Sequence, residues 1–335
     1  MLKFYIYFLI FFFFNASYSE DIVNKKTIKF IFGSCSNQNK LMPHWNYINS
    51  YKPDYLILLG DNVYGDFNNS DATNLQNAYK VLDNDKYFRL LKETTDIFSI
   101  WDDHDYGKND GGKNWIYKEK AKKLFLDFYN VNENDERRKR EGLYKSWEIY
   151  NSVKIKVIAL DTRYFKDEFT INRNINIKKK YVSDYNNKKT ILGKKQWNWV
   201  SNEFNTDYDI LLILSSIQIL SKNHGWEKWN NFPHERNKII NLIKNSKRPT
   251  IILSGDRHVG GIYKLNDKIY EITSSSFNQS EFNLIENDQL LIGKIITKNN
   301  FGFMKINTKE KVVDIQLREG FFNENKILSK IQIEF

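Results

Sequence analysis

Six short apolar runs, each bounded by Gly, Asp or Ser, constrain the fold of this chain most strongly. They are rich in Ile, Leu and Val, which is typical of strands buried on both faces. Stretches with the periodicity of helices lie between them, at 71–83, 115–129, 194–204 and 233–245. The predicted strands are residues 27–32, 55–59, 96–101, 153–160, 210–214 and 250–253. This alternation of strand and helix predicts sheets that are covered by helices.

After residue 260 the pattern changes to short strands joined by hairpin turns, at 261–265, 268–274, 302–307, 312–317 and 327–333. We therefore expect an α/β fold in which two mixed β-sheets form a sandwich flanked by helices. The late strands, within residues 261–335, are expected to complete the second sheet. The chain has 335 residues, of which 41% are hydrophobic, and no long Pro/Ser/Gly linker. Residues 20–335 are therefore predicted to form a single domain.

Residues 1–19 differ from the rest of the chain. Lys3 precedes an unbroken apolar run from Phe4 to Phe14, and Ser17 and Ser19 have small side chains at the spacing that a signal peptidase needs. Because the run is too short to span a bilayer, it predicts a cleavable signal peptide, with an uncleaved anchor as the alternative. We expect the mature protein to be secreted or periplasmic, without a transmembrane segment.

The composition narrows the chemistry further. The single cysteine, Cys35, excludes a disulfide within the monomer, and it is either a metal-bound thiolate or a small buried residue. The net charge of +10 comes from 51 Lys and Arg against 41 Asp and Glu. Because most of the excess is Lys spread among Asn-rich loops, we expect no stable complex with nucleic acid. We also expect a monomer.

Residues that bind metals follow the ends of several predicted strands. Cys35 comes shortly after one strand, Asp61 and Tyr64 follow a second, and Asp256 and His258 follow a third. We expect these side chains to meet, because the carboxyl ends of parallel strands lie along the same crevice. Thiolate, phenolate and imidazole ligands favour a metal such as ferric iron over Mg²⁺ alone. The sequence therefore predicts a hydrolytic site with several metals, in which Asp61 bridges two cations.

A further segment, Trp101-Asp102-Asp103-His104-Asp105, adds three carboxylates and an imidazole. Such a run is expensive to desolvate without cations or partners, and the alternative is a helix N-cap cluster with a surface histidine. We expect His104 to donate a proton to the leaving oxygen. Arg163 either contacts phosphate or forms a structural ion pair. Asn109 either offers an amide oxygen to a metal or belongs to an ordinary turn.

Four motifs of the chain resemble those of the PhoD-like (alkaline phosphatase D) branch of the calcineurin-like metallophosphatases, in residue types and in their order along the chain. They are Gly33-Ser34-Cys35, Gly60-Asp61-x-x-Tyr64, Asp102-Asp103-His104-Asp105-Tyr106-Gly107-x-Asn109-Asp110 and Gly255-Asp256-x-His258-x-Gly260. The resemblance covers residues 28 to 320. It implies the calcineurin-like sandwich and a phosphoesterase that uses Fe³⁺ and Ca²⁺, or other divalent metals. By residue match, the implied metal ligands are Cys35, Asp61, Tyr64, Asn109, Asp256 and His258, with Asp103 in the place of the metal-binding Asn of the wider superfamily.

From the motifs and the resemblance we expect an exported phosphoesterase that hydrolyses phosphate monoesters or diesters with metal-activated water. His104, Asp61 and Arg163 are its expected catalytic residues. One alternative is a phosphodiesterase specialised for a wall polymer, a phospholipid headgroup or extracellular nucleic acid. An alternative of another class is a module that binds phosphate ligands without catalysis.

Overall fold

The computed structural model of the chain describes residues 25–174, 180–281, 284–320 and 326–335. The predicted signal peptide, residues 1–19, lies outside these ranges. None of the helices within the described ranges is long and apolar enough to cross a membrane.

Six strands form the first sheet: β1 (Thr27–Gly33), β2 (Tyr55–Leu59), β3 (Asp96–Ile100), β12 (Asn300–Asn307), β13 (Val312–Glu319) and β14 (Ile327–Glu334). Their order across the sheet is β14-β13-β12-β1-β2-β3. The strands β1, β2 and β3 run parallel, whereas β12 pairs antiparallel with β1. All residues of β2 are buried, as is expected for a parallel strand that is covered on both faces.

Six strands also form the second sheet: β4 (Lys145–Tyr150), β5 (Lys154–Ala159), β8 (Ile210–Ser215), β9 (Thr250–Ser254), β10 (Gly260–Asn266) and β11 (Ile269–Ser274). Their order is β10-β11-β9-β8-β5-β4, and the four central strands run parallel. The short strands β6 (Thr170–Ile171) and β7 (Tyr181–Val182) pair with each other.

The late strands divide between the two sheets, so the prediction that they all complete the second sheet was wrong for three of them. The hairpin of β10 and β11 does extend the second sheet, whereas β12, β13 and β14 extend the first. One edge of β1 pairs with β2, and its other edge pairs antiparallel with β12. This pairing runs from Thr27 opposite Asn307 to Phe32 opposite Gly302. The pattern of apolar residues fixes which face of a strand is buried, but not which sheet edge it joins.

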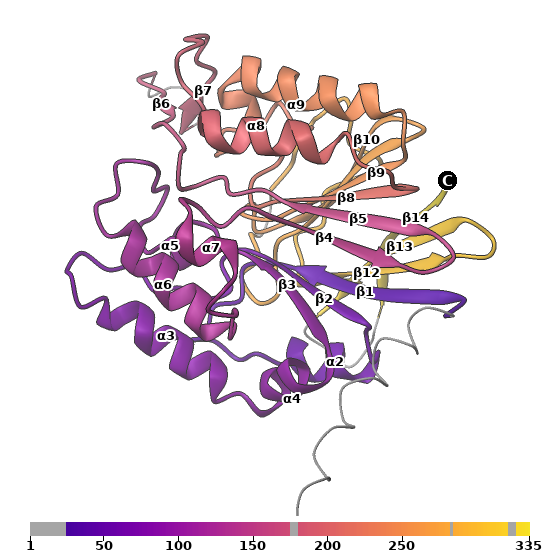
Figure 1. Cartoon of the computed structure of the whole chain (residues 1–335), viewed down its shortest axis with the longest axis horizontal. Coiled ribbons are helices and arrows are strands. Elements are labelled where there is room, and N and C mark those ends of the chain that lie inside the picture. Colours follow the sequence, from indigo (N-terminus) through magenta and orange to yellow (C-terminus); the bar gives the residue numbers. More distant parts are fainter. Residues whose placement is uncertain (1–24, 175–179, 282–283, 321–325) are drawn as a thin grey trace, which may run out of the picture.

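Figure 1 shows a sandwich of four layers, in which helices cover the outer face of each sheet. The first sheet is covered by α2 (His44–Ser50), α3 (Thr73–Asp83), α4 (Lys86–Thr94) and α6 (Lys118–Phe128), and the second by α8 (Gly193–Glu203) and α9 (Pro233–Ser246). The short helices α5 (Asp103–Tyr106) and α7 (Glu136–Lys139) lie in loops. Adjacent residues of one strand serve different layers: Leu212 packs in the core that both sheets share, and Leu211 packs with residues of α8 and α9.

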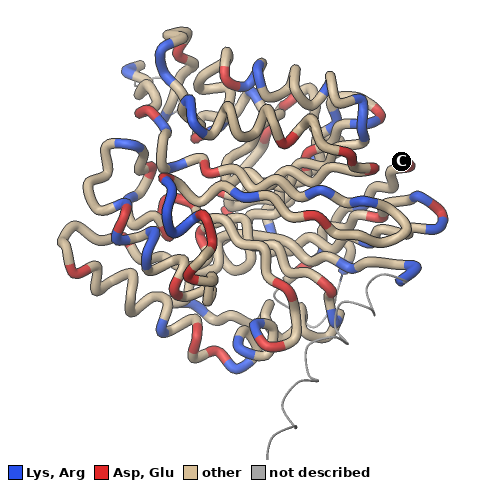
Figure 2. The backbone as a smooth tube through the Cα atoms, in the orientation of Figure 1, with Lys and Arg blue, Asp and Glu red and all other residues tan. Residues whose placement is uncertain are grey.

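Charged residues are mixed over the described chain. In Figure 2, Lys and Arg are interspersed with Asp and Glu over the helices and loops. Many of these charges form local ion pairs, such as Lys154 with Asp207 at 2.6 Å and Lys195 with Glu141 at 2.7 Å. The basic residues that give the positive net charge are therefore spread over the molecule in this view.

A buried carboxylate holds the loop that follows β8. Glu271, on β11, is fully buried and accepts hydrogen bonds from the N–H groups of Ile219 (2.8 Å) and Leu220 (2.6 Å). Arg236 of α9 donates to the carbonyl groups of the same two residues, both at 2.7 Å. Burial raises the pKa of Glu271 to about 7, and the hydrogen bonds from the loop oppose part of this rise.

This raised pKa predicts a specific pH dependence of stability. Because the folded chain binds the Glu271 proton more tightly than the unfolded chain, this contribution is full below pH 4.5 and is lost as the pH rises through 7. Between pH 4.5 and pH 8, wild type should lose on the order of 3 kcal/mol more stability than the Glu271→Gln variant. Urea unfolding of both proteins at the two pH values measures the difference. Equal losses in the two proteins would contradict the assignment.

Candidate metal centre

The predicted ligand residues follow strand ends at one end of the sandwich. Cys35 follows β1, Asp61 follows β2, and Asp256 and His258 follow β9. All four have a left-handed backbone, with φ of 60°, 48°, 67° and 56°. For residues other than glycine this conformation costs on the order of 1–3 kcal/mol, and it is concentrated at functional sites. Other residues, such as Lys52 and Lys247, also have this conformation, but four of the residues that the sequence predicts as ligands share it.

Glycine at the end of β2 is a steric requirement. Gly60 has φ +98°, and a Cβ atom added to it would lie 2.5 Å from the Cβ of Asp102. Only glycine lets the end of β2 approach the segment after β3 so closely. This approach brings Asp61 beside the carboxylates of residues 102–105.

Four unlike donor groups meet between the two sheets. The Sγ of Cys35 lies 3.6 Å from Oδ2 of Asp61, and the phenol oxygen of Tyr64 lies 3.0 Å from Nε2 of His258. The ligand atoms of Cys35, Asp61 and His258 all lie within 4.8 Å of one another. The structure thus brings together residues from three segments that are far apart in the sequence. We call Cys35, Asp61, Tyr64 and His258 the thiolate group.

A set of carboxylates adjoins the thiolate group. Ligand atoms of Asp102, Asp103 and Asp256 lie within 4.8 Å of one another, and so do those of Asp61, Asp103 and His104. Asp61 therefore belongs both to the thiolate group and to a set that contains Asp103. Shared carboxylates of this kind suit neighbouring cations. We call Asp102, Asp103 and Asp256 the carboxylate group.

Burial opposes the ionised form of these ligands when only protein surrounds them. It raises the pKa of Cys35 to about 12, and burial together with neighbouring carboxylates raises the pKa of Asp61 and Asp256 well above the usual range. Burial also lowers the pKa of His258 to about 4, which leaves its imidazole neutral. A neutral imidazole is the form that binds metal, and a cation would stabilise the thiolate and carboxylates. The donors and their burial therefore fit a bound metal ion.

His104 lies against both groups. Its Nδ1 lies 2.5 Å from Oδ2 of Asp66, its backbone N–H donates to Oδ1 of Asp61 at 3.3 Å, and its ring lies 4.2 Å from the ring of Tyr64. Burial alone would lower the pKa of His104, but Asp61, Asp66 and Asp103 raise it to about 10. Asp66 was not among the predicted site residues, although it comes only two residues after Tyr64, just beyond the motif that contains Asp61.

The run of residues 102–105 combines ligand-type and structural carboxylates. Asp102 is the N-cap of α5, and its N–H donates to Oδ2 of Asp105 at 3.1 Å. Asp105 also accepts from the N–H of Asn62 at 3.1 Å, which ties α5 to the segment after Asp61. The run thus contains an N-cap, as the alternative expected, but His104 is largely buried and is no surface histidine. Asp103 faces the other carboxylates, while Asp105 supports the backbone.

Arg163 forms structural ion pairs. Its side chain has no exposed surface, its Nε pairs with Asp102, and its Nη1 lies 2.5 Å from Oε2 of Glu227. The Nη2 lies 3.9 Å from Oδ1 of Asp256. Of the two roles that the sequence left open, the contacts are those of the structural ion pair, whereas contact with phosphate stays a prediction.

Asn109 differs from the other predicted ligands in burial, since they are buried or partly buried. Its side chain is exposed on the turn after α5, and the neighbouring Asp110 faces inward. The N–H of Asp110 donates to Oδ2 of Asp103 at 2.6 Å, and its carboxylate lies within 4.8 Å of Asp103 and Glu227. Lys166, also buried, lies 2.9 Å from Oε1 of Glu227. No role was predicted for Asp110, Lys166 or Glu227, which only the folded chain brings to the site.

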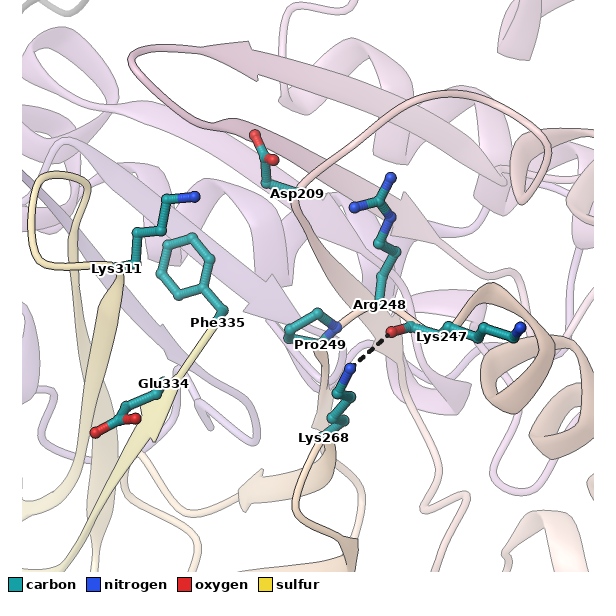
Figure 3. Close-up of a pocket in the computed structure, with 8 residues that line it drawn as sticks. All are labelled: Asp209, Lys247, Arg248, Pro249, Lys268, Lys311, Glu334 and Phe335. Carbon is teal, nitrogen blue, oxygen red and sulfur yellow. Dashed lines mark hydrogen bonds between the residues drawn. The ribbon is translucent and has the colours of Figure 1, made fainter.

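A cavity of about 480 Å³ lies at the other end of the sandwich (Figure 3). Asp209 and Pro249 line it just before β8 and β9, whereas the ligand-type residues follow the opposite end of β9. Lys268 donates to the carbonyl of Lys247 at 3.3 Å within this cavity. It is therefore separate from the candidate metal centre. Its lining residues are Asp209, Lys247, Arg248, Pro249, Lys268, Lys311, Glu334 and Phe335.

Solved structures share this fold at low sequence identity. A structure of PhoD matches with a TM-score of 0.73 and 16% identity, over 93% of this chain and 70% of that chain. GAP50, the anchor in the inner membrane complex of Plasmodium, matches with a TM-score of 0.62 and 10% identity, over 92% of this chain and 89% of that chain. Purple acid phosphatase PPD1 from yellow lupin (Lupinus luteus) seeds matches with a TM-score of 0.61 and 10% identity, over 92% of this chain and 54% of that chain.

The sequence itself matches a family. A search of curated proteins gives no match, but the family model of the PhoD-like phosphatases matches residues 30–319. This match covers most of the chain and agrees with the predicted metallophosphatase sandwich and with the resemblance of the motifs. The chain therefore belongs to the PhoD-like phosphatase family and is a phosphoric ester hydrolase.

Proposed function

We propose that the protein is an exported, metal-dependent phosphoesterase that acts on phosphate diesters in preference to monoesters. The observation that carries this proposal is the meeting of the thiolate group and the carboxylate group at one end of the sandwich. Bound cations would polarise the phosphoryl oxygens and offset the charge that develops on them. Export is supported by the signal-peptide pattern of residues 1–19. A monomer remains our expectation.

The donor chemistry supports a different metal for each group. Cys35, Tyr64 and His258 offer sulfur, phenolate and imidazole, which favour Fe³⁺ over a hard alkaline-earth cation. Asp102, Asp103 and Asp256 offer only carboxylate oxygens, which Ca²⁺ prefers. We therefore propose that iron binds at the thiolate group and that calcium binds beside it. Asn109, exposed in this structure, has no part in this proposal.

His104 is placed to assist the leaving group. Because Asp66 contacts Nδ1, the imidazole presents Nε2 as the nitrogen free to exchange a proton with substrate. The contact of its ring with Tyr64 fixes the plane of the imidazole beside the thiolate group. We propose that His104 protonates the departing alcohol oxygen, with Asp66 as its positioning residue.

Charge supports the preference for diesters. A monoester carries one more negative charge than a diester and needs further cations to bind. The buried cations beside the site already pair with carboxylates: Arg163 and Lys166 with Glu227, and Arg257 with Glu286 at 2.9 Å. They therefore add little positive potential for a dianionic substrate.

This preference can be measured with two chromogenic esters. Wild type supplied with Fe³⁺ and Ca²⁺ should hydrolyse bis(p-nitrophenyl) phosphate with kcat/KM about 10-fold above that for p-nitrophenyl phosphate, which corresponds to about 1.4 kcal/mol. A preference for the monoester would contradict the argument from paired cations. Hydrolysis of neither ester, with metals bound, would favour a non-catalytic module, since the fold also occurs in GAP50, an anchor protein.

A further inference from the structure

One hydroxyl group connects two residues of the thiolate group. Ser275 directly follows β11 and is fully buried. Its Oγ accepts a hydrogen bond from the backbone N–H of His258 at 2.9 Å and lies 3.2 Å from the Sγ of Cys35. Ser275 also donates its own N–H to the carbonyl of Val259 at 3.1 Å, which fixes it beside the loop after β9.

The available protons limit the direction of these contacts. A backbone N–H can only donate, so the oxygen of Ser275 is the acceptor from His258, and its own single proton stays available. The other contact of this hydroxyl is the sulfur of Cys35. The thiol of Cys35 has its own acceptor in Oδ2 of Asp61, at 3.6 Å, so the hydroxyl proton of Ser275 is available to the sulfur. Ser34, which directly precedes Cys35 in the sequence, has its Oγ 3.3 Å from the same sulfur.

We propose that Ser275 is a positioning residue of the metal centre, which donates an O–H···S hydrogen bond to the Cys35 thiolate while it holds the His258 backbone. This inference rests on the proposed role of Cys35 as a metal ligand. Partners that hydrogen-bond to metal ligands fix their orientation and tune the metal, and their loss commonly weakens metal binding about 10–100-fold. A hydrogen bond also withdraws electron density from sulfur, which raises the energy of charge transfer from sulfur to metal.

The test uses Co²⁺ as a spectroscopic probe of the thiolate. Metal-free protein is titrated with Co²⁺, and the near-ultraviolet charge-transfer band gives both the band energy and the affinity. In Ser275→Ala this band should move to lower energy, and Co²⁺ should bind about 10–100-fold more weakly. Ser276→Ala is the matched control, because Ser276 is also fully buried and its Oγ has no hydrogen-bond partner among the described residues. The control should keep the wild-type band and affinity.

A second pair of variants distinguishes the effect of the hydroxyl group from the effect of side-chain volume. Ser275→Thr keeps the hydroxyl and Ser275→Val replaces it with a methyl group of similar size, so only Thr should retain the band position. If Ser275→Ala and Ser275→Val behave like Ser276→Ala while wild type shows the band, the role of Ser275 is wrong and the metal centre stands. If the wild-type spectrum has no band that Cys35→Ala removes, both the metal centre and this inference are wrong.

Discussion

Asp61→Asn should lower kcat/KM for a phosphate diester by roughly 10³-fold, which corresponds to about 4 kcal/mol of lost transition-state stabilisation. The carboxylate of Asp61 belongs to the thiolate group and to the set that contains Asp103, so its loss affects both proposed cations. The amide of Asn keeps the shape of the side chain but removes the negative charge that two cations would share. Because burial and neighbouring carboxylates already disfavour the ionised form, the substitution should change the stability of the metal-free protein little.

The matched control for this variant lies at the other end of the same strand. Asp54 immediately precedes β2, accepts from the N–H of Lys29 at 2.8 Å and pairs with Lys25. Asp54→Asn should therefore keep the wild-type rate. Steady-state kinetics with Fe³⁺ and Ca²⁺ supplied to all three proteins measures the effect. An Asp61→Asn enzyme with the wild-type rate would show that the thiolate group is not the catalytic centre.

Arg163→Met should be among the most destabilising substitutions of this chain. The substitution removes the guanidinium from a buried group of charges. Asp102 and Glu227 each lose the cation that pairs with them. Removal of one partner from a buried ion pair typically costs about 3–5 kcal/mol, because an uncompensated charge remains inside the protein. Arg163→Lys keeps the charge but loses the planar fork, so it should be destabilised less.

Denaturant unfolding of metal-free protein tests this expectation. The control is Arg248→Met, since Arg248 is half-exposed and its Nη2 lies 3.7 Å from Asp207. An exposed pair of this kind contributes about 0–1 kcal/mol. Equal stabilities for Arg163→Met and Arg248→Met would contradict the structural role of the buried guanidinium and reopen its contact with substrate.

The central parallel strands could be predicted from the sequence because their burial is continuous. The predicted strand 55–59 coincides with β2, whose residues are all buried. The strand β4 was missed because it lies at a sheet edge and its sequence, Lys-Ser-Trp-Glu-Ile-Tyr, has only Ile149 buried. An edge strand needs no apolar run, so its pattern resembles that of a loop. The position of β12 beside β1 was not predictable either, because it depends on which sheet edge was free.

Within the candidate site, short motifs predicted which residue types occur better than which side chains point into the site. Cys35, Asp61 and His258 lie at strand ends, where the topology itself brings them together. Asn109 and Asp110 are adjacent, and the spacing alone could not show that Asp110, with φ 54°, turns inward.

The remaining site residues come from loops. Lys166 and Glu227 contact each other in the fold, but they lie far apart in the sequence. Their positions depend on packing after β5 and β8, which has no local sequence signal.

The most direct test is elemental analysis of the purified protein together with its visible absorption spectrum. The proposed centre predicts bound iron and calcium in wild type, a visible charge-transfer band from Tyr64 and Cys35 to Fe³⁺, and loss of metal in Asp61→Asn. Tyr64→Phe should remove the phenolate part of the band. A colourless, metal-free protein that hydrolyses phosphate esters at the full rate would contradict the account.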